Sequence, residues 1–522
     1  MRPRRFSSPG LLALLATACG WASPSASLAA EPARLQAGAA VIDVAPPKFP
    51  VIVNGMFTER TADRVVDTLS ARALVLRRGN EPAVAIVVVD SCMMPRELLD
   101  PAKLAASRLT GIPTPNMLIS ATHTHSAPSC MGALGSDPDP QYAQLLEGRI
   151  TDAIVAANAR LRPAKIGWTT AQAPDHTYNR RWILRPDKTR DDPFGDPTIR
   201  ANMHPGYQHP DFVGPSGPVD PEVAMLIVKD ADNRPLALLA NYSMHYFGSP
   251  MLSSDYYGRF NTLVADAWRG PASRGTADEK PVVMMSQGTS GDLMWMDYGS
   301  PQRQRTLEEY SASLASIVLA ALKTAESRLS DELPLVMKET TLTLKTRQAS
   351  PERLAWARTV MKELDGKKPT TQPQIYAREA LLLAERPTRE LKLQALRIGD
   401  VGIAAIPDEV FALTGLKIKA GSPLGTTFTM ELANGSEGYI PPPEQHSLGG
   451  YTTWNARTAG LEVDAEPRIT ETVLGLLEQV AGGRRRAIEE AETPASKALL
   501  AASPAAYYRL GDAVGPRIRD HA

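Results

Sequence analysis

The sequence is poor in cysteine, with three such residues among 522. So few cysteines exclude a disulfide framework, and a hydrophobic core must therefore stabilise the fold. The chain also lacks an excess of charge of either sign, because 57 basic residues face 57 acidic ones. This balance argues against nucleic acid or an anionic membrane as a partner. After the N-terminus, no apolar run reaches the ~18 residues of a membrane helix.

The first thirty residues follow the order of a secretory signal. Three arginines precede the apolar run Leu11–Ala18, and small residues follow as far as Ala30. We expect residues 1–30 to be a signal peptide that exports the protein to the periplasm, the cell surface or the extracellular space. Cys19 lies in Ala-Thr-Ala-Cys-Gly, a loose version of a bacterial lipoprotein cleavage site, so a lipid anchor at Cys19 stays open.

Two cysteines, Cys92 and Cys130, follow this segment. We expect both to be buried free thiols, with a disulfide between them as the alternative.

Strand and helix patterns alternate along the first third of the chain. Short apolar, β-branched runs at residues 39–44, 83–92 and 117–122 predict buried strands. Residues 142–161 have helical spacing and end before Pro163. This alternation favours an α/β fold, with mixed sheets flanked by helices, over an all-β sandwich.

The later segments continue this pattern. Strands are predicted at residues 222–229, 235–242, 281–285, 333–344, 391–398, 401–406 and 426–432, and helices at 306–324, 351–364 and 469–480. Gly399-Asp400 predicts a hairpin turn between two of these strands. Residues 183–220, rich in Pro, Gly, Asp and Arg, are expected to be one long loop, which is usually functional or mobile.

The main domain is expected to span residues 31–483. Residues 484–522 begin with a charged, helix-like linker at 484–492. Pro504–Asp512 looks like the opening strand of a laminin-G-like sandwich, which the few remaining residues cannot complete. The tail therefore either packs on the main domain or begins a truncated laminin-G-like domain.

A pair of histidines follows one of the predicted strands. The segment Ile119-Ser-Ala-Thr-His-Thr-His-Ser-Ala-Pro places His123 and His125 at its carboxyl end, and strand alternation puts both side chains on the same side. Polar residues at such strand ends are where α/β folds place their sites. His-x-His alone is a weak signal, since a surface or core pair is the more common explanation.

Three further residues complete a candidate metal site. His245 follows the strand 235–242, Glu409 follows the strand 401–406, and Tyr439 lies in Asn-Gly-Ser-Glu-Gly-Tyr. The ordinary alternatives are a core histidine, an acid at a helix N-terminus and a packed tyrosine. Two histidines and a carboxylate with an open position suit catalytic zinc, and this donor set favours zinc or iron over magnesium.

Taken in this order, these segments resemble the neutral ceramidase family, the non-lysosomal zinc amidases. The similarity runs from Ala37-Gly-Ala-Ala-Val-Ile-Asp-Val-Ala-Pro-Pro to about Glu471. It includes the specific run Gly111-Ile-Pro-x-x-Asn-Met-Leu-Ile-Ser-Ala-Thr-His-Thr-His-Ser-Ala-Pro. The resemblance implies a zinc-dependent amidase fold with one zinc ion and a water. The zinc ligands that it implies are His123, His245, Glu409 and Tyr439.

The resemblance also implies catalytic residues. His125 would support a ligand or handle protons. Arg180 and Tyr451 would face the scissile carbonyl and stabilise its developing negative charge. Asp292, in a Gly-Asp pair that the family shares, is expected to belong to the same site.

One departure from the family concerns a serine beside the zinc. The chain reads Gln287-Gly-Thr-Ser-Gly-Asp-Leu-Met, so that Met294 falls where the family has that serine. Methionine donates no hydrogen bond. Either the zinc-activated water acts without this serine, or Ser290 replaces it, or ceramide cleavage has been lost.

The expected function is therefore secreted, zinc-dependent hydrolysis of an amide in a small-molecule or lipid N-acyl substrate. The polar composition of residues 183–220 suits a polar substrate better than two lipid chains. An ester or N-acyl-sugar hydrolase of the same fold is one alternative. The other is a catalytically silent, zinc-containing binding protein, which Met294 supports.

Overall fold

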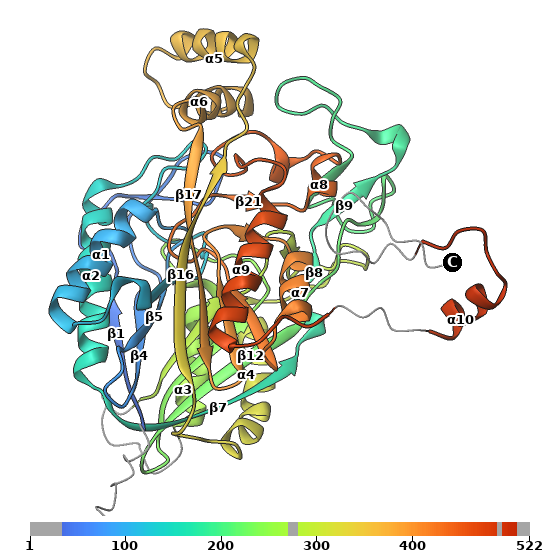
Figure 1. Ribbon diagram of the computed structural model, residues 1–522. Coiled ribbons are helices and arrows are strands. Elements are labelled where there is room, and N and C mark those ends of the chain that lie inside the picture. Colours follow the sequence, from blue (N-terminus) through green and yellow to red (C-terminus); the bar gives the residue numbers. More distant parts are fainter. Residues whose placement is uncertain (1–33, 270–279, 488–492, 509–522) are drawn as a thin grey trace, which may run out of the picture. The chain divides into compact units, whose positions relative to one another are not determined.

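The computed structural model describes residues 34–269, 280–487 and 493–508 (Figure 1). The expected signal peptide and Cys19 lie outside this part of the chain. Among the described helices, none is long and apolar enough to cross a membrane.

The largest sheet has eight strands and divides into two halves, in the order β14-β13-β12-β7-β1-β4-β5-β6. One half contains β1 (Leu35–Asp43), β4 (Ser70–Arg78), β5 (Val84–Val89) and β6 (Met117–Ala121). The other half contains β7 (Arg162–Gln172), β12 (Glu222–Asp230), β13 (Pro235–Tyr242) and β14 (Val282–Gln287). The halves are joined where Gln36 and Ala37 of β1 pair with Pro163 and Arg162 of β7. Because only two residue pairs join the halves, we describe each half as a separate wall of the fold.

A second sheet forms a third wall, in the order β16-β17-β18-β20. Its strands are β16 (Leu335–Lys345), β17 (Thr388–Ile398), β18 (Val401–Ala405) and β20 (Thr426–Met430). β17 and β18 form the predicted hairpin, and Gly399 in its turn has a φ of 63°. Leu74, Leu239 and Leu396, one from each wall, belong to one buried apolar cluster. The three walls therefore enclose a common core.

Helices cover the outer faces of the walls (Figure 1). α1 (Arg96–Thr110) and α2 (Pro140–Ala159) pack on the half that contains β4 and β5. α3 (Asp255–Trp268) and α4 (Leu307–Glu326) pack on the half that contains β12 and β14. α7 (Ala412–Gly421) and α9 (Ala465–Ala481) cover the second sheet. The predicted fold class, α/β with mixed sheets flanked by helices, is confirmed.

Each wall contains one parallel strand pair. These pairs are β5 with β6, β13 with β14, and β18 with β20. In a parallel pair, the carboxyl ends of both strands lie at the same edge of the sheet. In each wall, the segments that follow the two parallel strands therefore begin at the same edge of the sheet.

Residues 183–220 are not one long loop, which corrects the expectation from the sequence. They and the residues just before them form a small sheet in the order β10 (Ala201–Met203), β9 (Arg181–Leu184) and β11 (Phe212–Pro215). These strands have three or four residues each. Strands this short show almost no periodicity, which is why composition alone gave the wrong answer.

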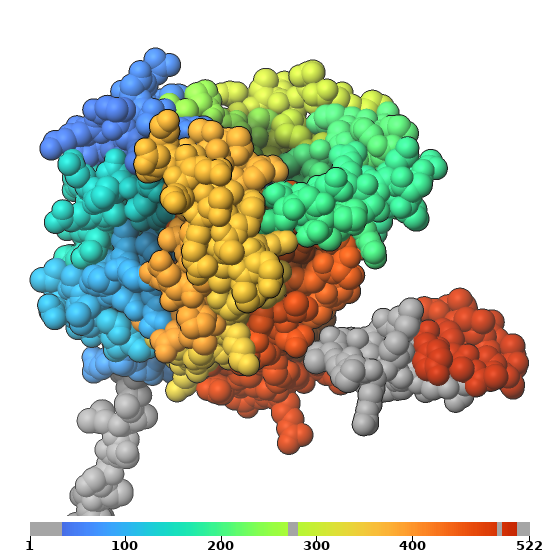
Figure 2. Space-filling model, turned by 90° about the horizontal axis from the view of Figure 1, so that it is seen from above, coloured from blue at the N-terminus to red at the C-terminus, as the bar shows by residue number. Residues whose placement is uncertain are grey.

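A helical hairpin, α5 (Pro351–Leu364) and α6 (Gln372–Ala384), is inserted between β16 and β17. It leaves the sheet at two paired residues, Lys345 and Thr388. The ring of Phe194, from the segment between β9 and β10, packs against one aromatic ring of each helix at 6.2 and 5.6 Å between centroids. Seen from above, the yellow hairpin and the green segment are neighbours on one face (Figure 2).

Short elements complete the described part of the chain. They are β2 (Val51–Val53), β3 (Arg60–Ala62), β8 (Tyr178–Asn179), β15 (Leu293–Met294), β19 (Glu409–Val410), β21 (Tyr439–Ile440), α8 (Pro443–His446) and α10 (Pro494–Ala501), with the 3-10 turns η1 (Thr114–Asn116), η2 (Pro174–His176), η3 (Pro186–Lys188) and η6 (Tyr451–Thr453).

The tail differs from its expected pattern where it is described. Residues 484–487 are not helical, and 488–492, the remainder of the expected linker helix, lie outside the described residues. Residues 504–508 form no strand, and only Tyr508 among them takes part in a β-bridge. Residues 509–512, the rest of the expected laminin-G-like strand, lie outside the described residues.

The predicted strands and helices of the main domain are present with shifted ends, whereas α1, α3, α6, α7, β4 and β7 were not foreseen. β4 illustrates why. It contains Arg72, a residue type that argues against a buried strand. The structure buries Arg72 by pairing its guanidinium with Asp90 at 2.7 Å. Cys92 and Cys130 are buried and free, as expected.

The shared core gives a direct test of the three-wall arrangement. Leu396→Ala, at a fully buried position, should lower the free energy of unfolding by about 3 kcal/mol, because it removes apolar contacts and leaves a cavity. Urea denaturation followed by circular dichroism measures this. Leu104→Ala on α1, where the side chain is 47% exposed, is the control and should change stability by less than about 0.5 kcal/mol. Equal effects of the two substitutions would contradict the assignment of the core.

Candidate metal centre

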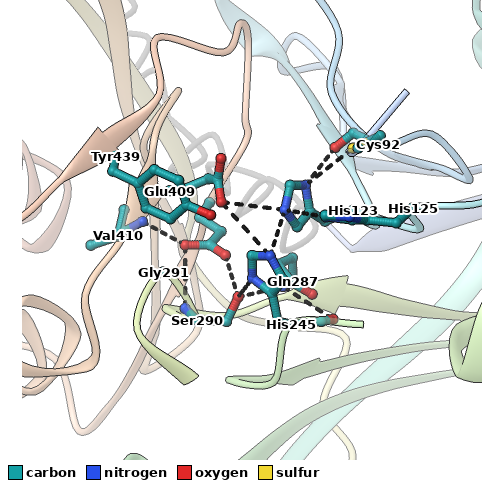
Figure 3. Close-up of polar contacts among 12 residues, drawn as sticks. Cys92, His123, His125, His245, Gln287, Ser290, Gly291, Glu409, Val410 and Tyr439 are labelled. Atoms are coloured by element: carbon teal, nitrogen blue, oxygen red, sulfur yellow. Dashed lines mark hydrogen bonds and ion pairs between the residues drawn. The ribbon is translucent and has the colours of Figure 1, made fainter. Parts of the chain in front are cut away.

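His123 lies two residues after the end of β6 and has a left-handed backbone, with φ at 70°. Such a conformation is uncommon for a residue with a Cβ and is typical of functional sites. The imidazole Nδ1 lies 2.7 Å from the carbonyl oxygen of Cys92, an acceptor to which it must donate. In the neutral form of the ring Nε2 therefore carries a lone pair, and this nitrogen faces the centre of the cluster (Figure 3).

His245 follows β13 in the second wall and is held by its backbone. Its carbonyl oxygen accepts hydrogen bonds from the Tyr257 hydroxyl and from Gln287 Nε2. Its ring is fully buried, and Ser290 Oγ lies 3.4 Å from Nδ1. With Nδ1 next to this hydroxyl, Nε2 is the nitrogen that reaches the cluster.

Glu409 and Tyr439 lie opposite each other in a short parallel pair, β19 with β21. The glycine before Tyr439 makes this approach possible. Gly438 has a φ of 88°, and a Cβ there would lie 2.4 Å from the backbone carbonyl of Thr458. A larger residue at Gly438 would displace β21, and with it Tyr439.

The side chains of His123, His245 and Glu409 point toward one another (Figure 3). The two histidine Nε2 atoms are 3.0 Å apart, and Glu409 Oε2 lies 3.3 Å from His123 Nε2 and 3.9 Å from His245 Nε2. Glu409 Oε2 is buried and accepts no hydrogen bond. Buried acceptors without donors are costly, and a cation among them removes that cost. The three residues thus form a group that could hold a metal ion.

The electrostatics of the cluster keep two of its histidines neutral. Burial, followed by the charges of Arg180 and His123, lowers the pKa of His245 well below its usual value. Burial, followed by His123 and Arg180, does the same to the pKa of His125. Burial also acts to lower the pKa of His123, but Glu409 and Cys92 outweigh it and raise that pKa well above its usual value. The carboxylate of Glu409 thus favours a positive charge next to it. A metal ion could supply this charge in place of a proton on His123.

Arg180 lies in the cluster, beside His245 and Tyr439. Its guanidinium is buried and donates from Nη2 to the Tyr439 hydroxyl at 3.1 Å and to the Gly291 carbonyl at 3.0 Å. The same nitrogen lies 3.2 Å from His245 Nε2. The ring of Tyr451 packs against that of Tyr439, with 5.5 Å between the centroids and an angle of 72° between the planes. Both residues therefore lie beside the expected phenol ligand.

His125 lies beside His123 and, unlike His123 and His245, is not fully buried. Its Nε2 is 3.2 Å from His123 Nε2, and its ring stacks on Tyr246 at 3.9 Å. The residue is partly exposed, and Nδ1 has no hydrogen-bond partner among the described residues. A Cβ at Gly55 would lie 2.7 Å from this ring, so the glycine provides the space that the imidazole occupies.

Asp292 is buried close to the cluster but does not point into it. Its carboxylate accepts from Asn179 Nδ2 at 2.7 Å and from the Ala412 N–H at 2.8 Å. Burial raises the pKa of Asp292 to about 6, although both of these donors oppose the shift. Its backbone carbonyl accepts the N–H of Arg180 at 2.8 Å. These contacts give Asp292 a positioning role, and direct catalysis by it stays a prediction.

Ser290, and not Met294, brings a hydroxyl to the cluster. Met294 is buried in β15, which pairs with β8. Ser290 Oγ donates to Glu431 Oε1 at 2.7 Å and lies beside Nδ1 of His245. Glu431 follows β20 and also accepts the N–H of Val410 at 2.7 Å. The serine therefore contacts His245 at Nδ1, on the side of the ring opposite the cluster, and does not occupy the centre of the cluster.

Three residues at the site were not foreseen from the sequence. Glu431 immediately follows a strand of a parallel pair, the same signal that identified His245 and Glu409. Tyr246 adjoins His245 in the sequence and stacks on His125. His204 donates its backbone N–H to the Arg180 carbonyl at 2.9 Å and carries a left-handed φ of 54°. No pattern in residues 183–220 pointed to His204.

The sequence matches no protein-family model and no curated protein. The fold, however, is that of the neutral ceramidases. The crystal structure of neutral ceramidase from Pseudomonas aeruginosa matches over 88% of this chain and 77% of its own, with a TM-score of 0.62 and 14% identity. A ceramidase complexed with C2 gives the same coverage, a TM-score of 0.61 and 15% identity. The resemblance read from the sequence is thus confirmed for the fold, and the chain is a strongly divergent example of it.

The donor geometry predicts the metal content of the protein. Purified wild-type protein should contain about one transition-metal ion per chain, and His123→Ala and Glu409→Ala should each lose it, since two remaining donors form too weak a site. Elemental analysis after dialysis gives the ratio. His209→Ala, at an exposed histidine outside the cluster, should keep the wild-type content. Metal-free wild-type protein, or retention by both cluster variants, would contradict the site.

Proposed function

We propose that this chain is an exported, zinc-dependent amidase that hydrolyses the amide bond of an N-acyl compound. The observation that carries the proposal is the convergence of His123, His245 and Glu409 on one buried point, with an oxygen of Glu409 left without a donor. The likeness to structures named ceramidases supports an amide as the bond that is cleaved. The signal-like residues 1–30 support export.

Zinc is the proposed ion, because two imidazoles and a carboxylate are the usual donors of a catalytic zinc site with an open position. Tyr439 is the proposed fourth ligand, since β21 places it opposite Glu409. When bound, zinc polarises a carbonyl oxygen and lowers the pKa of a water to near neutrality. The hydrogen bond between the Cys92 carbonyl and His123 Nδ1 fixes the tautomer that such binding needs.

The remaining residues have proposed roles that follow from their positions. Arg180 holds a permanent positive charge beside Tyr439, where negative charge develops on the attacked carbonyl oxygen. Tyr451 lies on the outer side of the same phenol and is placed to donate its hydroxyl. His125 is neutral, partly exposed and next to His123, so that it is the group able to carry a proton to the leaving amine.

A second candidate is a zinc-containing binding protein without catalysis, for which Met294 is the supporting observation. Ser290 weighs against it, because the chain retains a hydroxyl in contact with His245. An ester or N-acyl-sugar hydrolase would use the same groups, and only the choice of substrate distinguishes it from the amidase.

The enzyme and the silent binder differ in the expected effect of His125→Ala. If the protein is an amidase, this variant should keep its metal and lose turnover by roughly 10²- to 10⁴-fold, since general acid–base catalysis contributes about that much. Fatty-acid release from ceramide in detergent micelles and from short N-acyl amines is to be measured beside metal content.

The control is His209→Ala, which should match the wild type in both measurements. Wild-type protein that binds metal but releases no acyl group from any N-acyl amine or ester would favour the binding protein. Turnover of short N-acyl amines without turnover of ceramide would keep the amidase and exclude ceramide as its substrate.

A further inference from the structure

A cavity of about 360 Å³ lies outside the metal cluster, between the segment that precedes β10 and the segment 446–455. Arg353 of α5 and Phe194 are among the residues that line it. The guanidinium of Arg353 stacks on the Phe194 ring at 3.6 Å and pairs with Asp196 at 3.2 Å. The volume lies within the range of small-molecule sites, about 300–1,000 Å³.

Positive charge predominates in this cavity. Arg347 donates to the carbonyl oxygens of Leu461 and Ala459, and no carboxylate among the described residues pairs with it. Burial without a counter-charge lowers its pKa to about 10. Arg200 is exposed at the cavity and also forms no ion pair within the described part of the chain.

The one acidic side chain that lines the cavity, Asp192, is occupied by its own turn. One of its oxygens accepts the N–H groups of Phe194 and Asp196 at 2.8 and 3.1 Å, and the other accepts the hydroxyl of Thr198 at 2.8 Å. It therefore does not neutralise Arg200 or Arg347 by direct pairing, and the cavity offers its guanidinium groups to a ligand.

Two other lining residues hold polar atoms that lack partners. Trp454 Nε1 and Asn455 Oδ1 are buried and form no hydrogen bond with any residue that the structure describes. Asn455 Nδ2 donates to the Arg347 carbonyl at 2.8 Å, which fixes its side-chain orientation. Buried polar atoms without partners are rare in folded proteins and call for an explanation. An indole donor and an amide acceptor beside unpaired guanidinium groups suit an anionic ligand that also carries an N–H or a hydroxyl.

The cavity is linked to the metal centre by a row of aromatic rings. The Trp454 ring lies 6.1 Å from that of Tyr451, which in turn lies 5.5 Å from that of Tyr439. Trp454 directly follows η6, the turn that contains Tyr451. One short segment thus lines the cavity and also supports an expected metal ligand, which places the cavity beside the metal cluster.

We propose that this cavity is a substrate subsite that binds an acidic group, a carboxylate or a phosphate, on the amine side of the scissile N-acyl bond. The inference rests on the proposed amidase function and adds the class of its substrate. The amine side is assigned because the acyl side of an N-acyl lipid is a hydrocarbon chain, for which a cationic, polar cavity is unsuited. The favoured substrates are acidic N-acyl amines, in place of the uncharged N-acyl sphingoid lipids.

The test compares ligands that differ only in this charge. N-octanoyl-8-aminooctanoate is matched with its primary amide, and N-octanoyl-8-aminooctyl phosphate with N-octanoyl-8-aminooctanol, because a spacer of this length can pass the rings of Tyr451 and Trp454. Stopped-flow quenching of tryptophan fluorescence in the wild-type, metal-loaded protein gives Kd in the first milliseconds, before turnover. The acidic member of at least one pair should bind about tenfold more tightly, as expected for one or two charge-assisted hydrogen bonds. The pair that shows the preference identifies the acid as carboxylate or phosphate.

The assignment to this cavity is tested with variants. Arg200→Gln, at an exposed position, should reduce the ratio of the two Kd values toward one, and Arg347→Gln provides a second, independent removal of charge. Arg108→Gln on α1, outside the cavity, should keep the wild-type ratio. Equal Kd values within both pairs, or a preference that survives both cavity variants, would overturn the subsite.

Failure of the subsite and failure of the amidase are distinguishable in these data. Hydrolysis of both members of each pair at equal Kd values would retain the amidase and remove the subsite. A charge preference that Arg200→Gln abolishes, in a protein that hydrolyses neither member, would remove the amidase and retain an acid-binding cavity.

Discussion

This structure depends on one constraint: buried nitrogen and oxygen atoms of His123, His245 and Glu409 are held close together away from water. His123 Nε2, His245 Nε2 and Glu409 Oε2 come from three different walls, and they lie 3.0 to 3.9 Å apart in a buried place. A cation that satisfies them also connects the three walls at one end, while the shared apolar core connects them along their length. Metal binding and correct assembly of the walls are therefore thermodynamically linked.

Much of the fold could be predicted because its central strands are short apolar runs that end in turn residues. The prediction failed where a polar side chain is buried by a distant partner, as for Arg72 with Asp90, or where strands have only three or four residues, as in β9 to β11. The first case depends on an ion pair across strands, and the second on pairing between short strands that are separated in the chain. Neither cause can be read from periodicity within one segment.

Most of the candidate metal site was within reach of the sequence because three of its residues obey one rule. His123, His245 and Glu409 each follow a strand of a parallel pair, and Glu431 obeys the same rule without having been noticed. Tyr439 and Arg180 depended on resemblance, since nothing local distinguishes them from packed residues. The role of Ser290 needed the structure itself, because it arises from contacts with Glu431 and His245, each far away in the chain.

The helical hairpin α5–α6 leaves the second sheet at Lys345 and returns at Thr388, two residues that are already paired across β16 and β17. The two ends of this insertion are held together by the pairing of β16 with β17. Its length and sequence can therefore change without a change in the register of these two strands. Arg353 belongs to this hairpin, whereas the metal ligands belong to the three walls. A change of the hairpin can therefore alter the lining of the cavity around Arg353 while the group of His123, His245 and Glu409 keeps its geometry.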